Sequence, residues 1–236
     1  MNEAPWILVV ALCAQTARAD RPHEQWRGPD SQKCAVINCN VPAPNSPAPA
    51  SDPAAANDAR YDKLHMFDAV LPNGREIRES STYRPGTTAV AAPTPWGPLG
   101  ITVCYDLRFP QLYRTLAHAG CRMLAVPSAF TQATGELHWH ALLRARAIEN
   151  AAYVLAPATC GTHPGSHGTY GHSLVAAPSG EIVAEAGVEP CVILADLALA
   201  DADRARAAIP ALAHDRPYEL GDGAGGRPHA TAAAST

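Results

Sequence analysis

The sequence predicts a layered α/β domain. From Tyr61 onward, short apolar runs of strand length alternate with amphipathic stretches of helical spacing, an order typical of helices packed on a sheet. Of the 236 residues, 47% are hydrophobic and 17% charged, which is a globular composition. The 22 prolines amount to about twice average usage, and five of them fall between Pro42 and Pro53, before this alternation begins. The chain therefore divides into an atypical first part and a regular second part.

The regular part supplies strands and helices in turn. Strands are predicted at Leu99–Cys104, Met123–Val126, Ala152–Ala156, Ser173–Ala177, Ile182–Ala184 and Cys191–Ala195. Helices are predicted at Pro110–Ala119, Glu136–Asn150 and Leu197–Ala208. The first helix carries proline in its first turn, and the second repeats apolar residues at helical spacing.

Residues 1–60 are predicted to be an atypical, Pro-rich and largely irregular segment. Val41–Pro53 (VPAPNSPAPASDP) cannot form a helix or a central strand, because each proline removes a backbone donor. Trp6–Leu12 is the exception and predicts a buried strand. A secretory signal is the alternative interpretation of this run, but Glu3 and the lack of Lys or Arg before it argue against one. Residues 219–236 are predicted to be a flexible tail.

Composition and charge exclude several classes of protein. The formal net charge of −4 argues against nucleic acid as a partner. The longest uncharged N-terminal run, Ala4–Ala17, is too short to span a membrane. Seven irregularly spaced cysteines favour reduced thiols and a cytoplasmic location over a disulfide scaffold. A zinc site on Cys34 and Cys39 stays open as an alternative, although no second pair of ligands matches it.

Cys104 is the sharpest local feature. It closes an apolar strand and precedes YDLRFP, which turns into a helix, so its sulfur is expected at the sheet edge beside helix N–H groups that favour a thiolate. The alternative is a buried, inert cysteine. Lys63 (in YDKLHMF) and Glu79 (in RESSTYRPG) would each be merely solvated if considered alone. Together they fit Cys104, because a cation stabilises thiolate and oxyanion and a carboxylate can orient that cation.

Six ordered segments resemble the nitrilase-like carbon–nitrogen hydrolases, and within them the omega-amidase and deaminated-glutathione amidase branch. The segments are YDKLHMFDA, RESSTYRPG, GITVCYDLRFP, PSAFTQATGELHW, RARAIEN and YGHSLVAAPSGEIVAEAG. The resemblance implies an α-β-β-α sandwich, incomplete at its N-terminus, in a carbon–nitrogen hydrolase domain over residues 61–218.

The resemblance also implies a mechanism. Cys104 is expected to attack an amide carbonyl and, once ammonia leaves, to form a thioester that water hydrolyses. Lys63 and the backbone N–H of Tyr105 are expected to stabilise the tetrahedral intermediate, and Glu79 to position the lysine and the substrate.

The same resemblance indicates the substrate and the assembly. Phe130 and Thr131 match positions near the substrate pocket. Arg108 is a candidate partner for a substrate carboxylate, with a structural ion pair as the alternative. A small carboxylate-bearing amide, such as an omega-amide of a 2-oxo diacid, is the expected substrate. No metal or organic cofactor is implied, and a homodimer is expected.

The sequence departs from the family pattern in two places. The family's general-base glutamate has no match, because only Glu3 and Glu24 precede Lys63 and neither follows a suitable strand. The second hypothesis is therefore a catalytically impaired relic that acts, if at all, as a binding protein. His140 stands where the family usually has glutamate after His-Trp, which is expected to weaken a hydrogen-bond network.

Further candidates are expected to be structural. His138 and His140 should face different sides of their helix and so suit a shared metal poorly. His172, in YGHS, is expected to be a hydrogen-bonded support rather than a ligand. Cys13, Cys121, Cys160 and Cys191 are expected to be core or pocket-wall thiols, and Arg144 and Arg146 to form ion pairs with Glu149.

Overall fold

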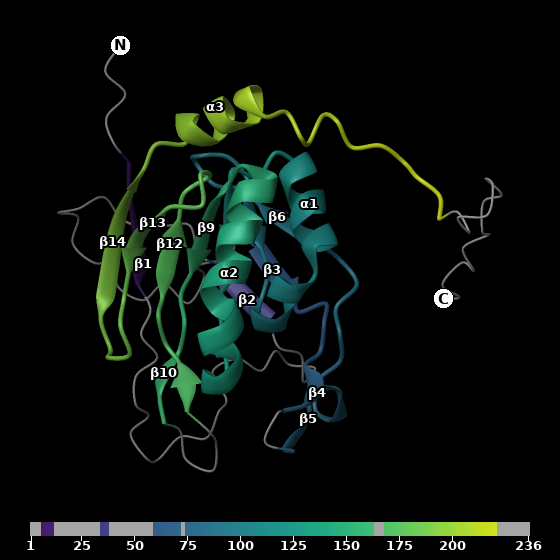
Figure 1. The fold of residues 1–236 in the computed structure, drawn as a ribbon, viewed down its shortest axis with the longest axis vertical. Coiled ribbons are helices and arrows are strands. Elements are labelled where there is room, and N and C mark those ends of the chain that lie inside the picture. The colour runs from purple at the N-terminus through teal and green to yellow at the C-terminus, as the bar shows by residue number, and fades with distance from the viewer. Residues whose placement is uncertain (1–5, 12–33, 38–58, 72–73, 163–167, 221–236) are drawn as a thin grey trace, which may run out of the picture.

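A six-stranded mixed sheet forms the centre of the protein (Figure 1). The computed structural model describes residues 6–11, 34–37, 59–71, 74–162 and 168–220. The sheet has the order β13-β12-β9-β8-β7-β6. Its strands are β6 (Val90–Ala92), β7 (Leu99–Ile101), β8 (Met123–Ala125), β9 (Tyr153–Ala156), β12 (Leu174–Ala176) and β13 (Ile182–Glu185). The three central strands, β7 to β9, run parallel, and the outer strands are antiparallel to their neighbours.

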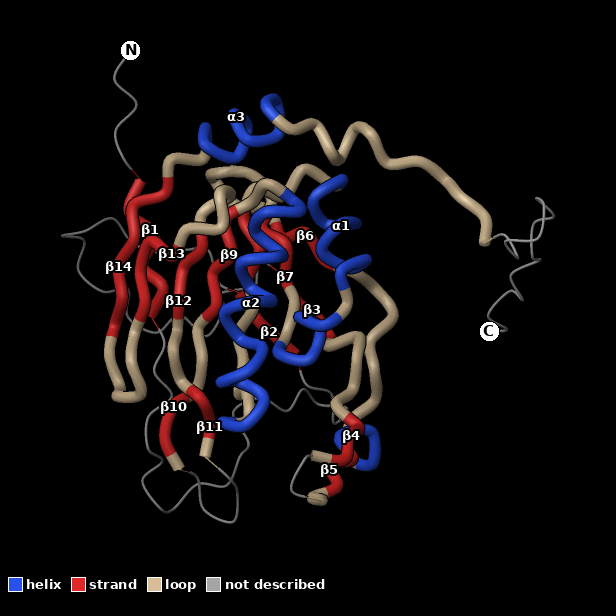
Figure 2. Tube along the Cα trace, viewed as in Figure 1, coloured by secondary structure: helices blue, strands red, loops and turns tan. Residues whose placement is uncertain are grey.

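Two helices cover one face of this sheet (Figure 2). Helix α1 (Pro110–His118) connects β7 to β8, and α2 (Gln132–Asn150) connects β8 to β9. A parallel pair of strands requires a crossover of this kind. Leu124 and Val154 on the sheet pack against Leu116, Trp139 and Leu143 of the helices. This helix–sheet interface contains the larger of the two main apolar clusters.

The opposite face of the sheet is also buried. Tyr153, Leu155 and Val175, which alternate with the residues under the helices, pack against Ile193 and Ala195 of β14 (Val192–Leu197). Because both faces are covered, the inner strands are apolar throughout, which explains the uninterrupted apolar runs of the sequence. The helices and sheet form two adjacent layers of the predicted sandwich, and β14 lies against the second face.

The remaining elements are short and lie at the periphery. Two-stranded pairs join β1 (Trp6–Ala11) to β14, β2 (Cys34–Ile37) to β3 (Ala59–Asp62), β4 (Asp68–Val70) to β5 (Glu76–Arg78), and β10 (Cys160–Gly161) to β11 (Thr169–Tyr170). The 3₁₀ turns η2 (Glu79–Ser81) and η3 (Cys104–Arg108) and the helix α3 (Ala200–Ala208) complete the assigned elements. None of the helices in the described ranges is long and apolar enough to cross a membrane.

The α/β class and the main predicted elements are confirmed, with three corrected boundaries. The strand predicted to reach Cys104 ends at Ile101, and Cys104 begins η3. Helix α2 begins at Gln132, before the predicted start. Strand β14 runs to Leu197, so α3 starts only at Ala200. The differences all fall at the ends of elements, which backbone hydrogen bonds define and the apolar period does not.

The described part of the N-terminal segment contains two strands, of which the sequence predicts one. The strand predicted at Trp6–Leu12 is present as β1. The irregular segment predicted around it contains a second strand, β2, whose register pairs Cys34 with Asp62. Strand β2 exists because it pairs with β3, and the local pattern of apolar residues does not predict such a distant partner. The Pro-rich run 41–53 and residues 221–236 lie outside the described residues.

Gly135 tests the packing of α2. A Cβ at this position would lie 2.3 Å from the Tyr170 ring. Alanine favours a helix by about 1 kcal/mol over glycine, but overpacking costs about 1–3 kcal/mol. We therefore expect Gly135→Ala to lower the melting temperature, measured by circular dichroism, despite the better helix former. Gly187→Ala, where a Cβ would meet nothing within 4 Å, is the control and should leave the melting temperature unchanged. A stabilised Gly135→Ala protein would contradict this packing.

Candidate active site

The backbone turns sharply at Cys104. The Thr102 N–H donates to the Ala125 carbonyl at 3.0 Å and the Cys104 N–H to the Pro127 carbonyl at 2.9 Å, which holds this segment beside the extension of β8. Cys104 then adopts a φ of 51° and begins η3. A non-glycine residue in the left-handed region is strained, and such strain concentrates at functional sites. The half-buried thiol therefore lies in the turn that follows β7, three residues after the strand ends at Ile101.

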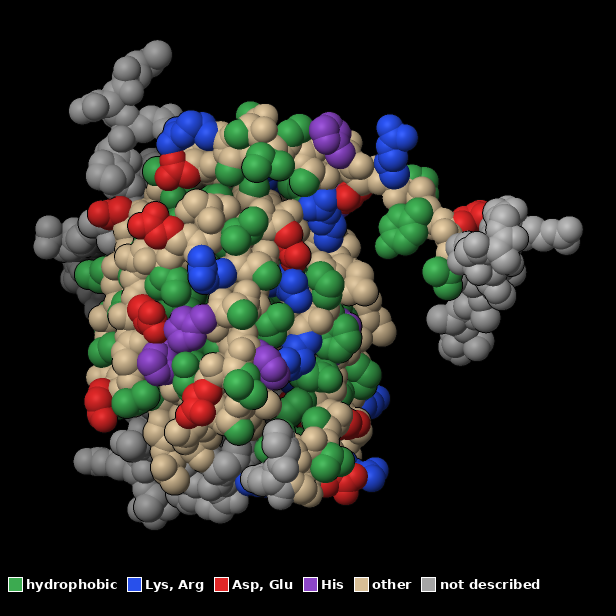
Figure 3. Space-filling view, in the orientation of Figure 1, with side chains coloured by type: hydrophobic (Ala, Val, Ile, Leu, Met, Phe, Trp, Pro, Cys, Tyr) green, Lys and Arg blue, Asp and Glu red, His purple; other side chains and the backbone are tan. Residues whose placement is uncertain are grey.

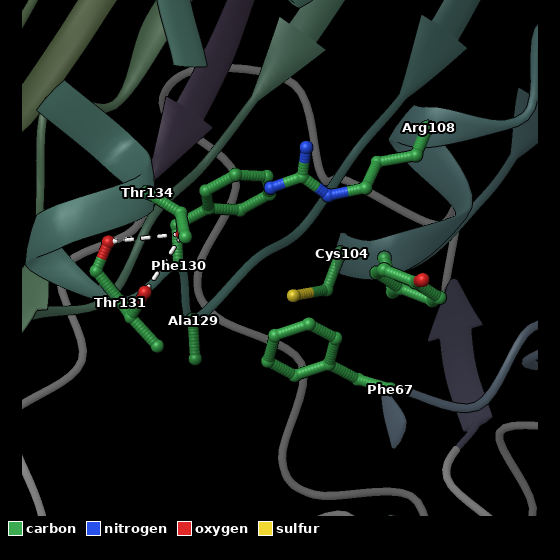
Figure 4. Close-up of a pocket in the computed structure, with 8 residues that line it drawn as sticks. Phe67, Cys104, Arg108, Ala129, Phe130, Thr131 and Thr134 are labelled. Carbon is green, nitrogen blue, oxygen red and sulfur yellow. Dashed lines mark hydrogen bonds between the residues drawn. The ribbon is translucent and has the colours of Figure 1, made fainter. Parts of the chain in front are cut away.

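The Cys104 side chain lines a small pocket that is open to solvent (Figure 4). The lining residues are Phe67, Cys104, Tyr105, Arg108, Ala129, Phe130, Thr131 and Thr134. Five of the seven predicted site residues lie on this one pocket: Cys104, Tyr105, Arg108, Phe130 and Thr131. The fold thus brings together segments from η3 and from the start of α2.

Lys63 and Glu79 form a buried ion pair that is hydrogen-bonded to the backbone of a pocket-lining residue. The Lys63 side chain is 2% exposed, and its Nζ lies 2.5 Å from Glu79 Oε2. The same carboxylate oxygen accepts the backbone N–H of Phe67, a pocket-lining residue, at 2.6 Å. The alternative of two separately solvated side chains is therefore wrong. Burying two charges is costly unless they are paired and hydrogen-bonded, and these two are.

Asp106 joins the lysine segment to the cysteine turn, a role that the sequence analysis missed. One carboxylate oxygen accepts the Tyr61 hydroxyl at 2.7 Å and the Val103 N–H at 2.9 Å. The other accepts the N–H of His65 at 3.1 Å and lies 2.8 Å from its Nδ1. Asp106 is completely buried. A carboxylate two residues after Cys104, in the first turn of a helix, was the available signal.

Burial and the adjacent Asp106 carboxylate raise the pKa of Tyr61 well above its ordinary value. Its hydroxyl therefore remains a donor to Asp106 throughout the physiological pH range. The Tyr61 oxygen also accepts the Leu64 N–H at 3.2 Å. These bonds fix the backbone on both sides of Lys63 relative to η3.

Arg108 directs its guanidinium into the pocket (Figure 4). The guanidinium carbon lies 5.3 Å from the centre of the Phe130 ring, and Nη1 lies 3.3 Å from His138 Nδ1. Among the described residues no carboxylate pairs with it, so the alternative of a structural ion pair has no partner there. A positive charge on an aromatic wall suits an anionic ligand.

Of the two ion pairs predicted with Glu149, the one with Arg146 is present and the one with Arg144 is not. Arg146 pairs with Glu149 at 2.8 Å, as expected, and its other N–H groups donate to the Leu107 carbonyl of η3. Arg144 does not pair with Glu149. Instead it donates to the Gly180 carbonyl at 2.8 Å, because five residues of helix separate it from that glutamate.

The remaining cysteines and histidines are placed as follows. Cys121 and Cys160 are buried as predicted, whereas Cys191 is exposed, because it precedes β14 in a surface turn. His138 and His140 diverge as predicted, toward Arg108 and Glu185 respectively. His172 is hydrogen-bonded to Glu185 as a support would be, and His140 joins the same network rather than weakening it. Cys13, Cys39, His163 and His167, with the Cys34 side chain, lie outside the described residues, so the zinc alternative stays untested.

The sequence of this chain is similar to known carbon–nitrogen hydrolases. The carbon–nitrogen hydrolase family matches residues 50–207. The chain is 43% identical over 158 residues to a deaminated glutathione amidase of Synechocystis, covering 66% of this chain and 58% of the relative. It is 40% identical over 161 residues to omega-amidase NIT3 of Saccharomyces cerevisiae, covering 68% and 55%. The chain thus spans little more than half the length of these relatives.

The fold of this chain is also similar to solved structures of the nitrilase superfamily. The Caenorhabditis elegans NitFhit protein superposes with a TM-score of 0.65 at 40% identity, over 69% of this chain and 40% of that one. Saccharomyces cerevisiae Nit3, a member of the nitrilase superfamily, gives 0.59 at 36% identity, over 66% and 54%.

Asp106→Asn tests whether this carboxylate positions the thiol. The asparagine amide group would place a donor where a carboxylate oxygen of Asp106 now accepts two hydrogen bonds, so we expect the free energy of unfolding to fall by about 1–3 kcal/mol. We also expect the pH profile for alkylation of Cys104 by iodoacetamide to change. Mass spectrometry of the labelled peptide measures that rate. Asp203→Asn, on the surface of α3, is the matched control. An Asp106→Asn protein with lower stability but an unchanged alkylation profile would contradict a positioning role.

Proposed function

The chain belongs to the carbon–nitrogen hydrolase family, and on that premise we propose that it hydrolyses a small carboxylate-bearing amide through a thioester on Cys104, with release of ammonia. One observation carries the proposal. Cys104 and Arg108 line one pocket, and the buried Lys63–Glu79 pair is joined to that pocket through the hydrogen bond from the Phe67 N–H to Glu79. This arrangement supplies a nucleophile, an anchor for a substrate anion and a fixed cation.

The first step is attack by Cys104 on the amide carbonyl. The resulting oxyanion needs a donor, and the Cys104 N–H is already bonded to the Pro127 carbonyl. The Tyr105 N–H is the better candidate, because the first N–H groups of a helix have no partner within it. The Lys63 ammonium adds positive charge from behind Phe67.

The second step expels the leaving group and requires a proton for it. The Lys63–Glu79 pair can hold that proton in a water-poor position, since its members are bonded at 2.5 Å and almost completely buried. Water then hydrolyses the thioester and restores the thiol. Glu79 acts here by orienting Lys63, as the resemblance implies.

The pocket favours a short substrate with one anionic end. Phe67, Ala129 and Phe130 provide apolar walls, and Arg108 provides the positive charge. An omega-amide of a 2-oxo diacid fits this description. Deaminated glutathione is the second candidate, because relatives at 43% identity are named for that activity. The two differ in leaving group, which is ammonia in the first case and a peptide amine in the second.

The relic hypothesis receives no support from relatives that are named as amidases. We further propose that the protein works as a homodimer in the cytoplasm, where its thiols stay reduced. Cys104, Cys121 and Cys191 are all free thiols.

Cys104→Ala should abolish hydrolysis, because the alanine protein cannot form the thioester. We expect a fall in rate of at least about 10³-fold, measured as ammonia release from 2-oxoglutaramate and as amine release from deaminated glutathione. Cys191→Ala removes an exposed thiol elsewhere and should leave the rate unchanged. Activity that survives in Cys104→Ala, or an unmodified protein inactive on both substrates, would refute the proposal.

Arg108→Met should weaken binding of anionic substrates selectively. A charge-assisted hydrogen bond contributes about 1.5–3 kcal/mol, so KM for 2-oxoglutaramate should rise about 10- to 100-fold, while KM for a neutral amide such as propionamide should change little. Arg204→Met, on the exposed side of α3, is the matched control. An equal rise in KM for both amides would show that Arg108 supports the fold of the pocket and does not bind the carboxylate.

A further inference from the structure

A second cluster of ionisable side chains lies outside the pocket. His140 on α2, His172 before β12 and Glu185 at the end of β13 converge on one point. His140 Nε2 lies 2.8 Å and His172 Nδ1 lies 2.9 Å from the same Glu185 oxygen. The three potential ligand atoms all lie within 4.8 Å of one another. Figure 3 shows histidine and acidic side chains gathered on this face of the molecule.

The cluster combines the side chains that bind transition metals in proteins. His140 and His172 each offer one imidazole nitrogen, and Glu185 offers a carboxylate oxygen.

The backbone of His172 is held in place from both sides of the cluster. His172 has a φ of 55°. Its carbonyl accepts the indole N–H of the buried Trp139, next to His140, at 2.8 Å, and its N–H donates to the Gly187 carbonyl at 3.0 Å. Tyr170 stacks on the His172 ring with centroids 4.4 Å apart. The ring positions are thus fixed by the fold before any ligand binds, which lowers the entropic cost of binding.

The cluster remains open to solvent. The three side chains are each 27–34% exposed. A ligand of ionic size can therefore reach the ring nitrogens without a rearrangement of the core, and a water molecule can occupy a fourth position.

We propose that His140, His172 and Glu185 form a binding site for a divalent transition metal, with Zn²⁺ as the fitting ion. Two imidazole nitrogens and one carboxylate oxygen, with a fourth position for water, are a known ligand set for zinc. Mg²⁺ prefers an all-oxygen shell and should bind poorly. The metal replaces the hydrogen bonds that Glu185 now accepts. Each imidazole would bind it in the tautomer that carries the proton on the other ring nitrogen, so the proton that now points at Glu185 moves to that nitrogen through solvent. The three ligands lie on α2, on the turn that precedes β12, and on β13. The metal would therefore cross-link these three segments.

The site differs from the pairing considered in the sequence. His138 and His140 face different directions, as predicted, and do not share a metal. The chain's fold instead supplies His172 and Glu185, which lie 32 and 45 residues after His140 (172 − 140 and 185 − 140).

Titration calorimetry of the full chain with Zn²⁺ tests the proposal. The Cys104→Ala protein is used as the background, so that the pocket thiol cannot capture the metal. We expect saturable binding with one equivalent and a higher melting temperature with Zn²⁺ but not with Mg²⁺. His140→Gln and Glu185→Gln, in the same background, should each weaken binding at least as much as the roughly 10- to 100-fold that loss of an outer-shell partner causes.

His214→Gln is the matched control, because it removes an exposed histidine far along the chain and should leave the affinity unchanged. Equal Zn²⁺ affinity in the His140→Gln, Glu185→Gln and background proteins would overturn the proposal, as would the absence of saturable binding tighter than about 100 μM. Co²⁺ gives an answer that needs no cluster variant to fold. Its absorption spectrum in the background protein should show nitrogen and oxygen ligation, and a thiolate charge-transfer band would place the metal elsewhere and refute the site.

Discussion

The site depends on one buried carboxylate. Asp106 lies in the turn that begins with Cys104 and accepts four hydrogen bonds, which hold the segment from Tyr61 to His65 against η3. Lys63 lies within that segment, so the position of the cation relative to the thiol follows from Asp106. A carboxylate in an apolar interior requires these donors, because an unpaired buried charge costs several kcal/mol. The same bonds therefore satisfy Asp106 and organise the site.

Charge is distributed unequally around the pocket. Lys63 and Glu79 neutralise each other behind the wall, so the pair adds little net field at the mouth. Arg108, which pairs with no carboxylate in the described ranges, leaves one uncompensated positive charge inside. Under the proposed function, this charge would pair with the single anionic end of the substrate.

Helix α2 connects the separate parts of the protein. Thr134 lines the pocket near its N-terminal end, Arg146 bonds the Leu107 carbonyl of η3 near its C-terminal end, and His140 faces the His172–Glu185 cluster between them. Trp139 fixes the His172 backbone through the same helix. One helix therefore carries residues of the pocket, of the contact with η3 and of the histidine cluster.

The sequence alone determined the α/β class, the three α-helices and five of the six strands of the central sheet, because apolar periods are local signals. It placed Cys104 at a strand-to-helix turn and grouped it with Lys63 and Glu79. Only the tertiary structure decided that Lys63 and Glu79 are buried together, that Asp106 joins two distant segments, that β2 pairs with β3, and that His140 meets His172 and Glu185. Each of these depends on contacts between residues far apart in the chain, for which no local period exists.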